Sequence, residues 1–194
     1  MTDYWDVLEF WFSEENYSKI FIKNEEFDEE IRKNFFGTWE RAKQGLFFEW
    51  RKDLRGRLAE IIILDQFSRH LFRNDRRAYE QDTMALVLAQ ELMSDPYFVT
   101  LYEEERNFAM MPFMHSESYE LHLWAEEYFH NYTGEATIEF EEQHRLILER
   151  FGRFPYRNRV LGRESTEEEE RLFGQSMGDF FFPEELLDER IEVK

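Results

Sequence analysis

Apolar side chains recur at helical spacing along most of the chain, and this period limits the fold more than any other feature. In the clearest run, Phe27, Ile31, Phe35 and Trp39 follow one another every four residues, which places all four on one face of a helix. Glycine and proline, which end helices and form turns, number only 8 and 4 in 194 residues. No segment alternates apolar and polar residues as a half-buried strand does. We therefore predict an all-α fold.

Capping residues and chain breaks divide this pattern into about eight to ten helices. Four polar residues are expected N-caps, because their side chains accept hydrogen bonds from the first turn of a helix; they are Asn24, Asp53, Asp82 and Ser116. Ser165-x-x-Glu168, or Thr166-x-x-Glu169 one residue later, has the form of a capping box that begins the last helix. Residues 152–163 are expected to form an ordered loop. The main helices are expected at 5–12, 25–44, 54–72, 83–93, 101–111, 117–133 and 135–151.

Length and charge restrict the class of protein. The 194 residues are close to the roughly 150 of an average domain, so we expect one helical domain over residues 1–194. The net charge is −19, from 24 basic and 43 acidic residues, whereas nucleic acids and anionic membranes bind basic surfaces. The first residues lack the features of a signal peptide, and no apolar run approaches the roughly 18 residues of a membrane span. We expect a cytoplasmic protein without nucleic-acid or membrane partners, and a homodimer remains an open alternative.

Missing residue types exclude several kinds of chemistry. The chain has no cysteine, which excludes disulfides, thiolate zinc sites, cysteine nucleophiles and iron–sulfur clusters. His115, Glu117 and His122 lack a spacing typical of metal ligands, and no glycine-rich phosphate loop or serine nucleophile elbow is present. We predict no metal and no cofactor.

Arginine is concentrated in two short stretches of this acidic chain. Between Arg150 and Arg163 there is no acidic residue, and Asp75 is the only one between Arg69 and Arg77. Arginine is suited to bidentate pairing with carboxylate or phosphate, so the two stretches folded together would form an anion-binding pocket. The alternative is that these arginines pair with the surplus of acidic side chains and only fasten the loop to helices. The arginines are 150, 153, 157, 159 and 163, and 69, 73, 76 and 77.

Asp65, Arg69 and Arg73 lie four residues apart, within an arc of roughly 80° on one helix face. This polar face borders the apolar stripe of Ile61 and Ile62, so its charges must be paired or used. In the simpler interpretation, Asp65 and Arg69 form an intrahelical pair supported by Gln66. In the alternative, Asp65 faces a cleft and orients an arginine or a histidine from another helix.

Two histidines are candidates for chemistry. His115 follows Pro112 at an expected helix start, where the helix dipole lowers the pKa of an imidazole and keeps it available as a base. Glu117 in the same turn also suits the dipole, and a purely structural role for His115 and Ser116 is the alternative. His144 lies on the apolar side of its helix, where a histidine is more often a core residue than a catalyst.

Three motifs in order resemble a bacterial family, domain of unknown function 924. They are Leu64-Asp65-Gln66-Phe67-x-Arg69, Pro112-Phe113-Met114-His115-Ser116-Glu117, and the run from Arg150 to Ser165 that contains Phe151-Gly152-Arg153-Phe154-Pro155 and Arg157-Asn158. The resemblance extends from about residue 5 to 173 and leaves an acidic extension at 174–194. It implies an all-helical fold similar to tetratricopeptide-repeat proteins, with helix pairs stacked in a right-handed curve, and it implies no reaction.

The chain departs from the family pattern at three positions. Ser68 replaces a proline, His70 an asparagine, and Tyr156 the histidine of a Phe-Pro-His-Arg-Asn run, which mildly favours binding over catalysis. The resemblance carries the candidate site onto the matching residues, which are Asp65, Gln66, Arg69, Arg73, His115, Ser116, Glu117, Arg153, Arg157, Asn158 and Arg163, with His144 added.

Two functions fit these residues. The first is a binding module that holds an anionic small molecule or an acidic peptide end in an arginine-lined concave pocket. The second is a hydrolase or transferase in which His115 is the general base, Asp65 or Glu117 orients it, and arginines stabilise developing negative charge. In both, the arginine-rich stretch is expected to fold back over helix 54–72 and leave an open hollow beside Asp65 and His115.

Overall fold

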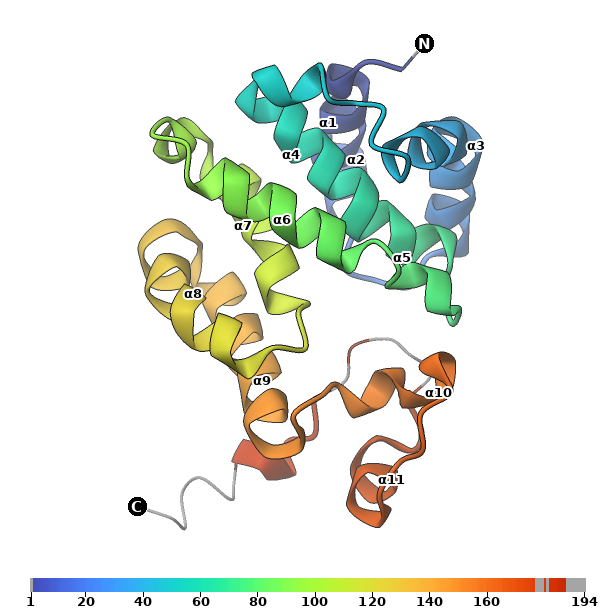
Figure 1. The fold of residues 1–194 in the computed structure, drawn as a ribbon. Helices are drawn as coiled ribbons and strands as arrows, with labels where there is room; N and C mark the ends of the chain where they lie inside the picture. The colour runs from blue at the N-terminus through green and yellow to red at the C-terminus, as the bar shows by residue number, and fades with distance from the viewer. Residues whose placement is uncertain (1, 177–179, 181, 188–194) are drawn as a thin grey trace.

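The computed structural model describes residues 2–176, 180 and 182–187. This part of the chain contains eleven α-helical segments and no strand, so the all-α prediction is confirmed. Several segments are single turns, which is why the number exceeds the eight to ten expected. Figure 1 shows the N-terminal helices at one end of the molecule and α10 and α11 at the other. The stacking of helix pairs in a tetratricopeptide-like curve remains a prediction.

The N-terminal half is built around the stripes that the periodicity predicts. Asn24 caps α3 by accepting a hydrogen bond from the backbone of Phe27, and the four apolar residues of the α3 stripe are buried. Helix α4 packs against α1, α6 and α7. The helices of this half are α1 (Tyr4–Phe12), α2 (Glu14–Tyr17), α3 (Glu25–Ala42), α4 (Leu54–Ile62), α5 (Ser68–Leu71), α6 (Asp82–Met93) and α7 (Glu103–Met114).

The predicted helix 54–72 is interrupted by a π-helical turn, η2 (Ile63–Phe67), between α4 and α5. Every residue of this turn is buried, including Asp65 and Gln66. A π-turn adds a residue to the helical repeat and is found frequently at functional sites. Asp65 and Arg69 lie together as the predicted arc requires, but α5 ends at Leu71, so Arg73 lies beyond the helix and outside that arc.

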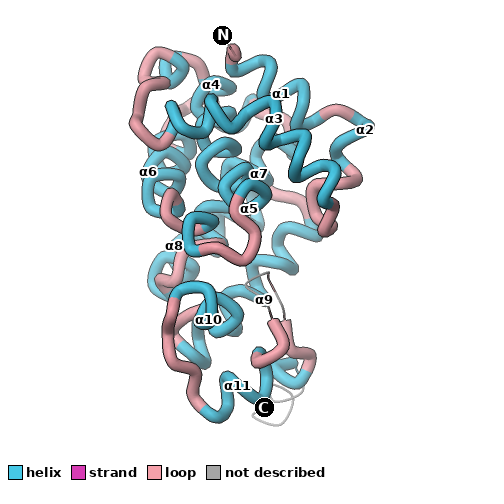
Figure 2. Tube along the Cα trace, turned by 90° about the vertical axis from the view of Figure 1, so that its right-hand side faces the viewer, coloured by secondary structure: helices cyan, strands magenta, loops and turns pink. Residues whose placement is uncertain are grey.

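The C-terminal half consists of two long helices followed by short ones. They are α8 (Tyr119–Tyr132), α9 (Glu135–Phe151), the 3₁₀ turn η5 (Pro155–Arg157), α10 (Asn158–Leu161) and α11 (Glu167–Phe173). The expected loop 152–163 therefore contains two helical turns. Figure 2 shows α10 and α11 at the end of the molecule away from α1 and α3. The capping box is the Thr166–Glu169 pair, in which each side chain bonds the other's backbone N–H.

Three expected helix boundaries are wrong. Ser118, not Ser116, caps α8. Pro112 lies inside α7, which continues to Met114. Asp82 is the first residue of α6 rather than its cap, and its carboxylate is bonded to Arg69.

Buried apolar residues form two clusters. The larger one joins α1 to α8, and the smaller one joins α9, η5 and α11. Of the predicted site residues, Asp65 and Gln66 lie in η2, Arg69 in α5 and Arg157 in η5, and His115 is at the end of α7. Of the acidic extension at 174–194, residues 177–179, 181 and 188–194 lie outside the described residues.

Candidate functional site

Asp65 and His115 form a hydrogen-bonded pair at the junction of η2 and α7. The Nδ1 atom of His115 lies 2.7 Å from Oδ1 of Asp65, which is fully buried. An ionised carboxylate only accepts hydrogen bonds, so Nδ1 carries the proton and Nε2 of a neutral His115 has a free lone pair. His115 keeps 13% of its side-chain surface exposed. The Gln66 side chain donates a second hydrogen bond to Asp65.

The charges around this pair set both pKa values. Burial alone would raise the pKa of Asp65, but the charge of Arg69 and the contacts with His115 and Gln66 outweigh it and hold the pKa far below its usual value. Burial and the charge of Arg69 lower the pKa of His115, and Asp65 offsets only part of this effect. His115 is therefore neutral at pH 7.

The predicted direction of the His115 shift was right and its predicted cause was wrong. His115 is the C-cap of α7, with its backbone N–H bonded to Met111, rather than a residue at a helix start. A helix C-terminus favours a cationic imidazole, so the dipole does not lower this pKa. Burial and Arg69 do.

A chain of ion pairs connects Asp65 to the arginine-rich segment. Nη1 of Arg69 lies 3.1 Å from Asp65, and Nη1 and Nη2 bond the two oxygens of Asp82, each at 3.0 Å. Nη1 of Arg157 lies 3.4 Å from the same Asp82. Arg157 therefore contacts α6 and is joined to Arg69 of α5 through the shared Asp82, and the expectation that the late arginine-rich stretch folds back over helix 54–72 stays a prediction.

Arg157 is held between aromatic rings. Its guanidinium carbon lies 4.5 Å from the centroid of the Tyr79 ring and 4.7 Å from that of Phe154, within the range of cation–π attraction. The residue is 4% exposed. Its Nε–H is buried and forms no hydrogen bond with the described residues.

The other arginines of the predicted site form ion pairs with carboxylates. Arg73 lies away from Asp65 and bonds both oxygens of Asp28. Arg153 bonds both oxygens of Glu169, the capping-box residue of α11. These arginines fasten elements to one another, as the structural alternative predicts.

Arg163, Asn158 and Glu117 form a second fastening point. Arg163 bonds both oxygens of Glu117, at 2.7 and 2.9 Å, and its Nε donates to Oδ1 of Asn158. Glu117 also accepts a hydrogen bond from the backbone N–H of Phe154, and these contacts lower its pKa against the opposing effect of burial. Of the two carboxylates considered for orienting His115, Asp65 contacts it, and Glu117 is committed to Arg163.

Ser116 and His144 border the pair. The Ser116 carbonyl accepts a hydrogen bond from Nε2 of His122, which fixes the turn that carries His115. The His144 ring lies 6.0 Å from that of His115, and its Nδ1 donates to the Phe140 carbonyl at 2.7 Å. Burial holds the pKa of His144 well below its usual value. His144 is thus the buried core histidine that its apolar stripe predicts, and it also lies beside His115.

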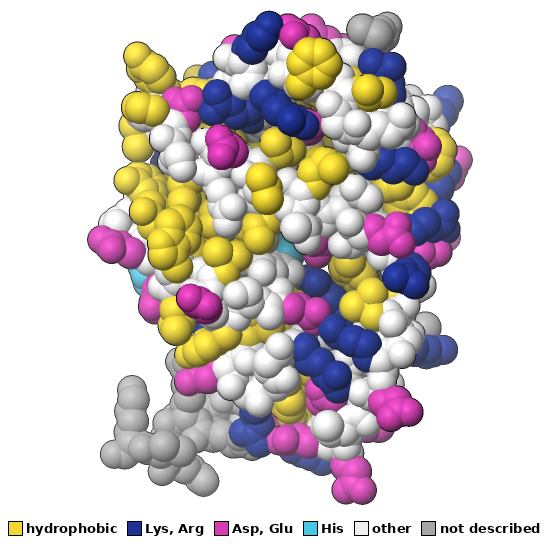
Figure 3. Space-filling view, viewed as in Figure 1, with side chains coloured by type: hydrophobic (Ala, Val, Ile, Leu, Met, Phe, Trp, Pro, Cys, Tyr) yellow, Lys and Arg dark blue, Asp and Glu magenta, His cyan; other side chains and the backbone are white. Residues whose placement is uncertain are grey.

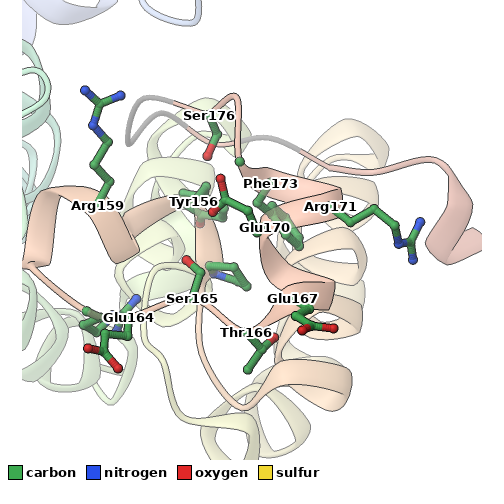
Figure 4. Close-up of a pocket in the computed structure, with 13 residues that line it drawn as sticks. Tyr156, Arg159, Glu164, Ser165, Thr166, Glu167, Glu170, Arg171, Phe173 and Ser176 are labelled. Atoms are coloured by element: carbon green, nitrogen blue, oxygen red, sulfur yellow. The ribbon is translucent and has the colours of Figure 1, made fainter.

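A cavity formed by the described residues lies away from Asp65 and His115. It has a volume of about 970 Å³ and lies between η5, α10 and α11. Figure 4 shows Tyr156, Ser165 and Glu170 on its walls, while Arg159 extends away from its middle. Tyr156, at the position of the family histidine, is buried there, and burial raises its pKa. Neither Asp65 nor His115 lines this cavity, so the hollow expected beside them is not this one.

Searches for other kinds of site gave no candidate. In the described ranges, no three His, Cys, Asp or Glu side chains are grouped so that they could hold a metal ion. Among the helices of these same ranges, none combines the length and apolarity needed to cross a membrane.

The comparisons with known proteins decide the family. A sequence model for "Bacterial protein of unknown function (DUF924)" matches residues 7–176. The chain belongs to the DUF924 family. A solved structure, "Structure of Protein of Unknown Function ATU0120 from Agrobacterium tumefaciens", is similar to this DUF924 protein with a TM-score of 0.81 and 32% identity, over 87% of this chain and 94% of that one. A comparison with curated proteins gave no match.

The sequence did not reveal Asp82 and Tyr79 as part of the site. Asp82 was expected to cap a helix, yet it is the carboxylate shared by Arg69 and Arg157. Tyr79 precedes it by three residues and covers one face of Arg157. Their signal was the stretch from Arg69 to Arg77, because Tyr79 and Asp82 lie within five residues of its end.

Proposed function

We propose that this DUF924 protein is a hydrolase or transferase in which His115 is the general base. The observation that carries this proposal is the Asp65–His115 pair, in which a fully buried carboxylate accepts from Nδ1 at 2.7 Å. In this arrangement Nε2 takes a proton from water or from a substrate hydroxyl, and the carboxylate stabilises the imidazolium that forms. Nε2 then returns the proton to the leaving group.

The electrostatics of the pair support this role. A neutral histidine at pH 7 is ready to accept a proton, and the lowered pKa of His115 keeps it neutral. Asp65 stays ionised, since Arg69 and Gln66 stabilise its charge. The net charge of −19 supports a cytoplasmic protein that acts on small molecules rather than on nucleic acid or membranes.

The test is hydrolysis of chromogenic esters, with 4-nitrophenyl acetate and 4-nitrophenyl phosphate as the first two probes. His115→Asn should lower kcat/KM by about 100-fold or more. His130→Asn is the matched control, because His130 is an exposed residue of α8. The proposal fails if the wild-type protein hydrolyses neither probe nor any member of a wider ester panel, or if His115→Asn retains full activity.

A binding module that catalyses no reaction is the second candidate. The Nε–H of Arg157 favours it, because this donor forms no hydrogen bond with the described residues. Such a module would bind an anionic small molecule or an acidic peptide end beside Arg157 without changing the bound molecule chemically. Anion binding without turnover of any ester would support this function over the first.

A further inference from the structure

Arg157 differs from the arginines around it in how its hydrogen-bond donors are used. Arg73, Arg153 and Arg163 each hold both oxygens of one carboxylate. Among the described residues, the guanidinium of Arg157 forms one hydrogen bond, from Nη1 to an oxygen of Asp82 at 3.4 Å. The opposite edge of its guanidinium, formed by Nε and Nη2, is the edge that Arg73 and Arg153 use for their carboxylates.

The shared carboxylate leaves the charge of Arg157 only partly neutralised. Both oxygens of Asp82 are already bonded by Arg69 at 3.0 Å. A buried guanidinium with an unpartnered N–H is costly in a folded protein. A ligand that accepts from this edge would remove that cost.

The surroundings of Arg157 hold its plane in place. The rings of Tyr79 and Phe154 pack against it, so the Nε and Nη2 donors, which form no hydrogen bond with the described residues, are held in a fixed plane. The cluster remains in contact with solvent, since the Arg69 and Asp82 side chains keep 20% and 17% of their surface exposed. Figure 3 shows basic side chains gathered below the middle of this face of the molecule.

We propose that the Nε/Nη2 edge of Arg157 is a subsite for an oxyanion with two terminal oxygens, a carboxylate or a phosphoryl group. Planar bidentate recognition of such groups is the chemistry for which guanidinium is best suited. This inference rests on the proposed function in one respect: the oxyanion is taken to be part of the substrate on which His115 acts. The substrate class is then an ester or anhydride that carries a carboxylate or phosphate group.

The experiment measures anion binding by calorimetry and thermal shift, with inorganic phosphate and acetate as separate probes at constant ionic strength. Arg157→Lys keeps the positive charge but loses the paired donors, and it should raise the Kd for the bound probe by about tenfold or more. Arg153→Lys is the matched control, because Arg153 is closed by Glu169 and should bind as the wild type does. If only phosphate binds, the subsite is specific for a phosphoryl group. If acetate binds as well, the subsite accepts any group with two terminal oxygens.

The subsite and the general base fail in different ways. His115→Asn should leave phosphate and acetate binding unchanged, so loss of turnover with intact binding contradicts neither proposal. No binding of either probe to the wild type, or equal binding to Arg157→Lys, overturns the subsite. If Arg157→Lys does not fold, a wild-type crystal soaked in phosphate decides the matter: the anion must lie within hydrogen-bond distance of Nε of Arg157, and an anion bound elsewhere overturns the proposal.

Discussion

Oδ1 of Asp65 accepts a hydrogen bond from Nδ1 of His115 at 2.7 Å, across 50 residues of sequence. The carboxylate has no exposed surface, Gln66 donates to its Oδ2, and Nη1 of Arg69 lies 3.1 Å from its Oδ1. One buried side chain therefore fixes the orientation of the imidazole and supplies half of an ion pair.

Asp65→Asn should reduce both activity and stability. The amide does not stabilise an imidazolium, so kcat/KM should fall by about 100-fold or more. Arg69 would lose one of its two carboxylates in a largely buried setting, which should lower the free energy of unfolding by about 3 kcal/mol. Ester hydrolysis and urea unfolding measure the two effects. Asp75→Asn, which breaks the exposed pair with Arg77, should change neither by more than a small amount, and an equal effect of the two variants would contradict this account.

Stability should fall as the pH drops below neutral. Burial holds the pKa of His144 well below its ordinary 6.5, and the pKa values of His70 and His115 are also lowered. The unfolded chain therefore binds protons near pH 6.5 that the folded chain does not, and stability rises with pH through this range. Each such histidine contributes up to about 1.4 kcal/mol between pH 7.5 and 5.5.

Urea unfolding at pH 7.5 and 5.5 tests this expectation. The free energy of unfolding of the wild type should be lower at pH 5.5, and His144→Gln should show a smaller loss between the two values. His130→Gln, at an exposed position of α8, should lose as much as the wild type. A wild type that is more stable at pH 5.5 would show that these histidines are charged in the folded state.

The helices were predictable because their signals are local. Asn24 caps α3, and the stripe from Phe27 to Trp39 is buried, since a period of four residues fixes one face whatever packs against it. The π-turn at Ile63–Phe67 was missed because its residues have the composition of a buried helix. Nothing in a single sequence separates the two.

The partners of the arginines were not predictable. Arg157 bonds Asp82, 75 residues away in the sequence, and Arg163 bonds Glu117, 46 residues away. The chain has 43 acidic side chains that could have been their partners. The sequence indicated that arginine and carboxylate groups would meet, but pairing depends on how the helices pack. Asp65 and His115 were both singled out from the sequence, with Asp65 or Glu117 as the expected partner of His115, and the structure shows that the partner is Asp65.

Thr166→Ala should weaken the last helix. The Thr166 side chain accepts from the backbone of Glu169, whose carboxylate bonds the Thr166 N–H in return and also holds Arg153. Loss of the N-cap should cost about 1 kcal/mol and speed amide exchange over residues 167–173. Ser165→Ala is the control, because Ser165 contacts Asn158 instead of the helix. Faster exchange in Ser165→Ala than in Thr166→Ala would place the cap at Ser165.

Two helical glycines should respond to alanine in opposite directions. Gly37 is exposed in α3, and a Cβ there meets nothing within 4 Å, so Gly37→Ala should raise the free energy of unfolding by about 0.5–1 kcal/mol through the lower backbone entropy of the unfolded chain. At Gly56 in α4, a Cβ would lie 2.1 Å from the Trp50 carbonyl oxygen. Backbone cannot yield as a flexible side chain does, so Gly56→Ala should cost about 1–3 kcal/mol. Urea midpoints of the two variants measure the signs directly, and stabilisation by both substitutions would contradict the close contact between α4 and η1 (Trp50–Lys52).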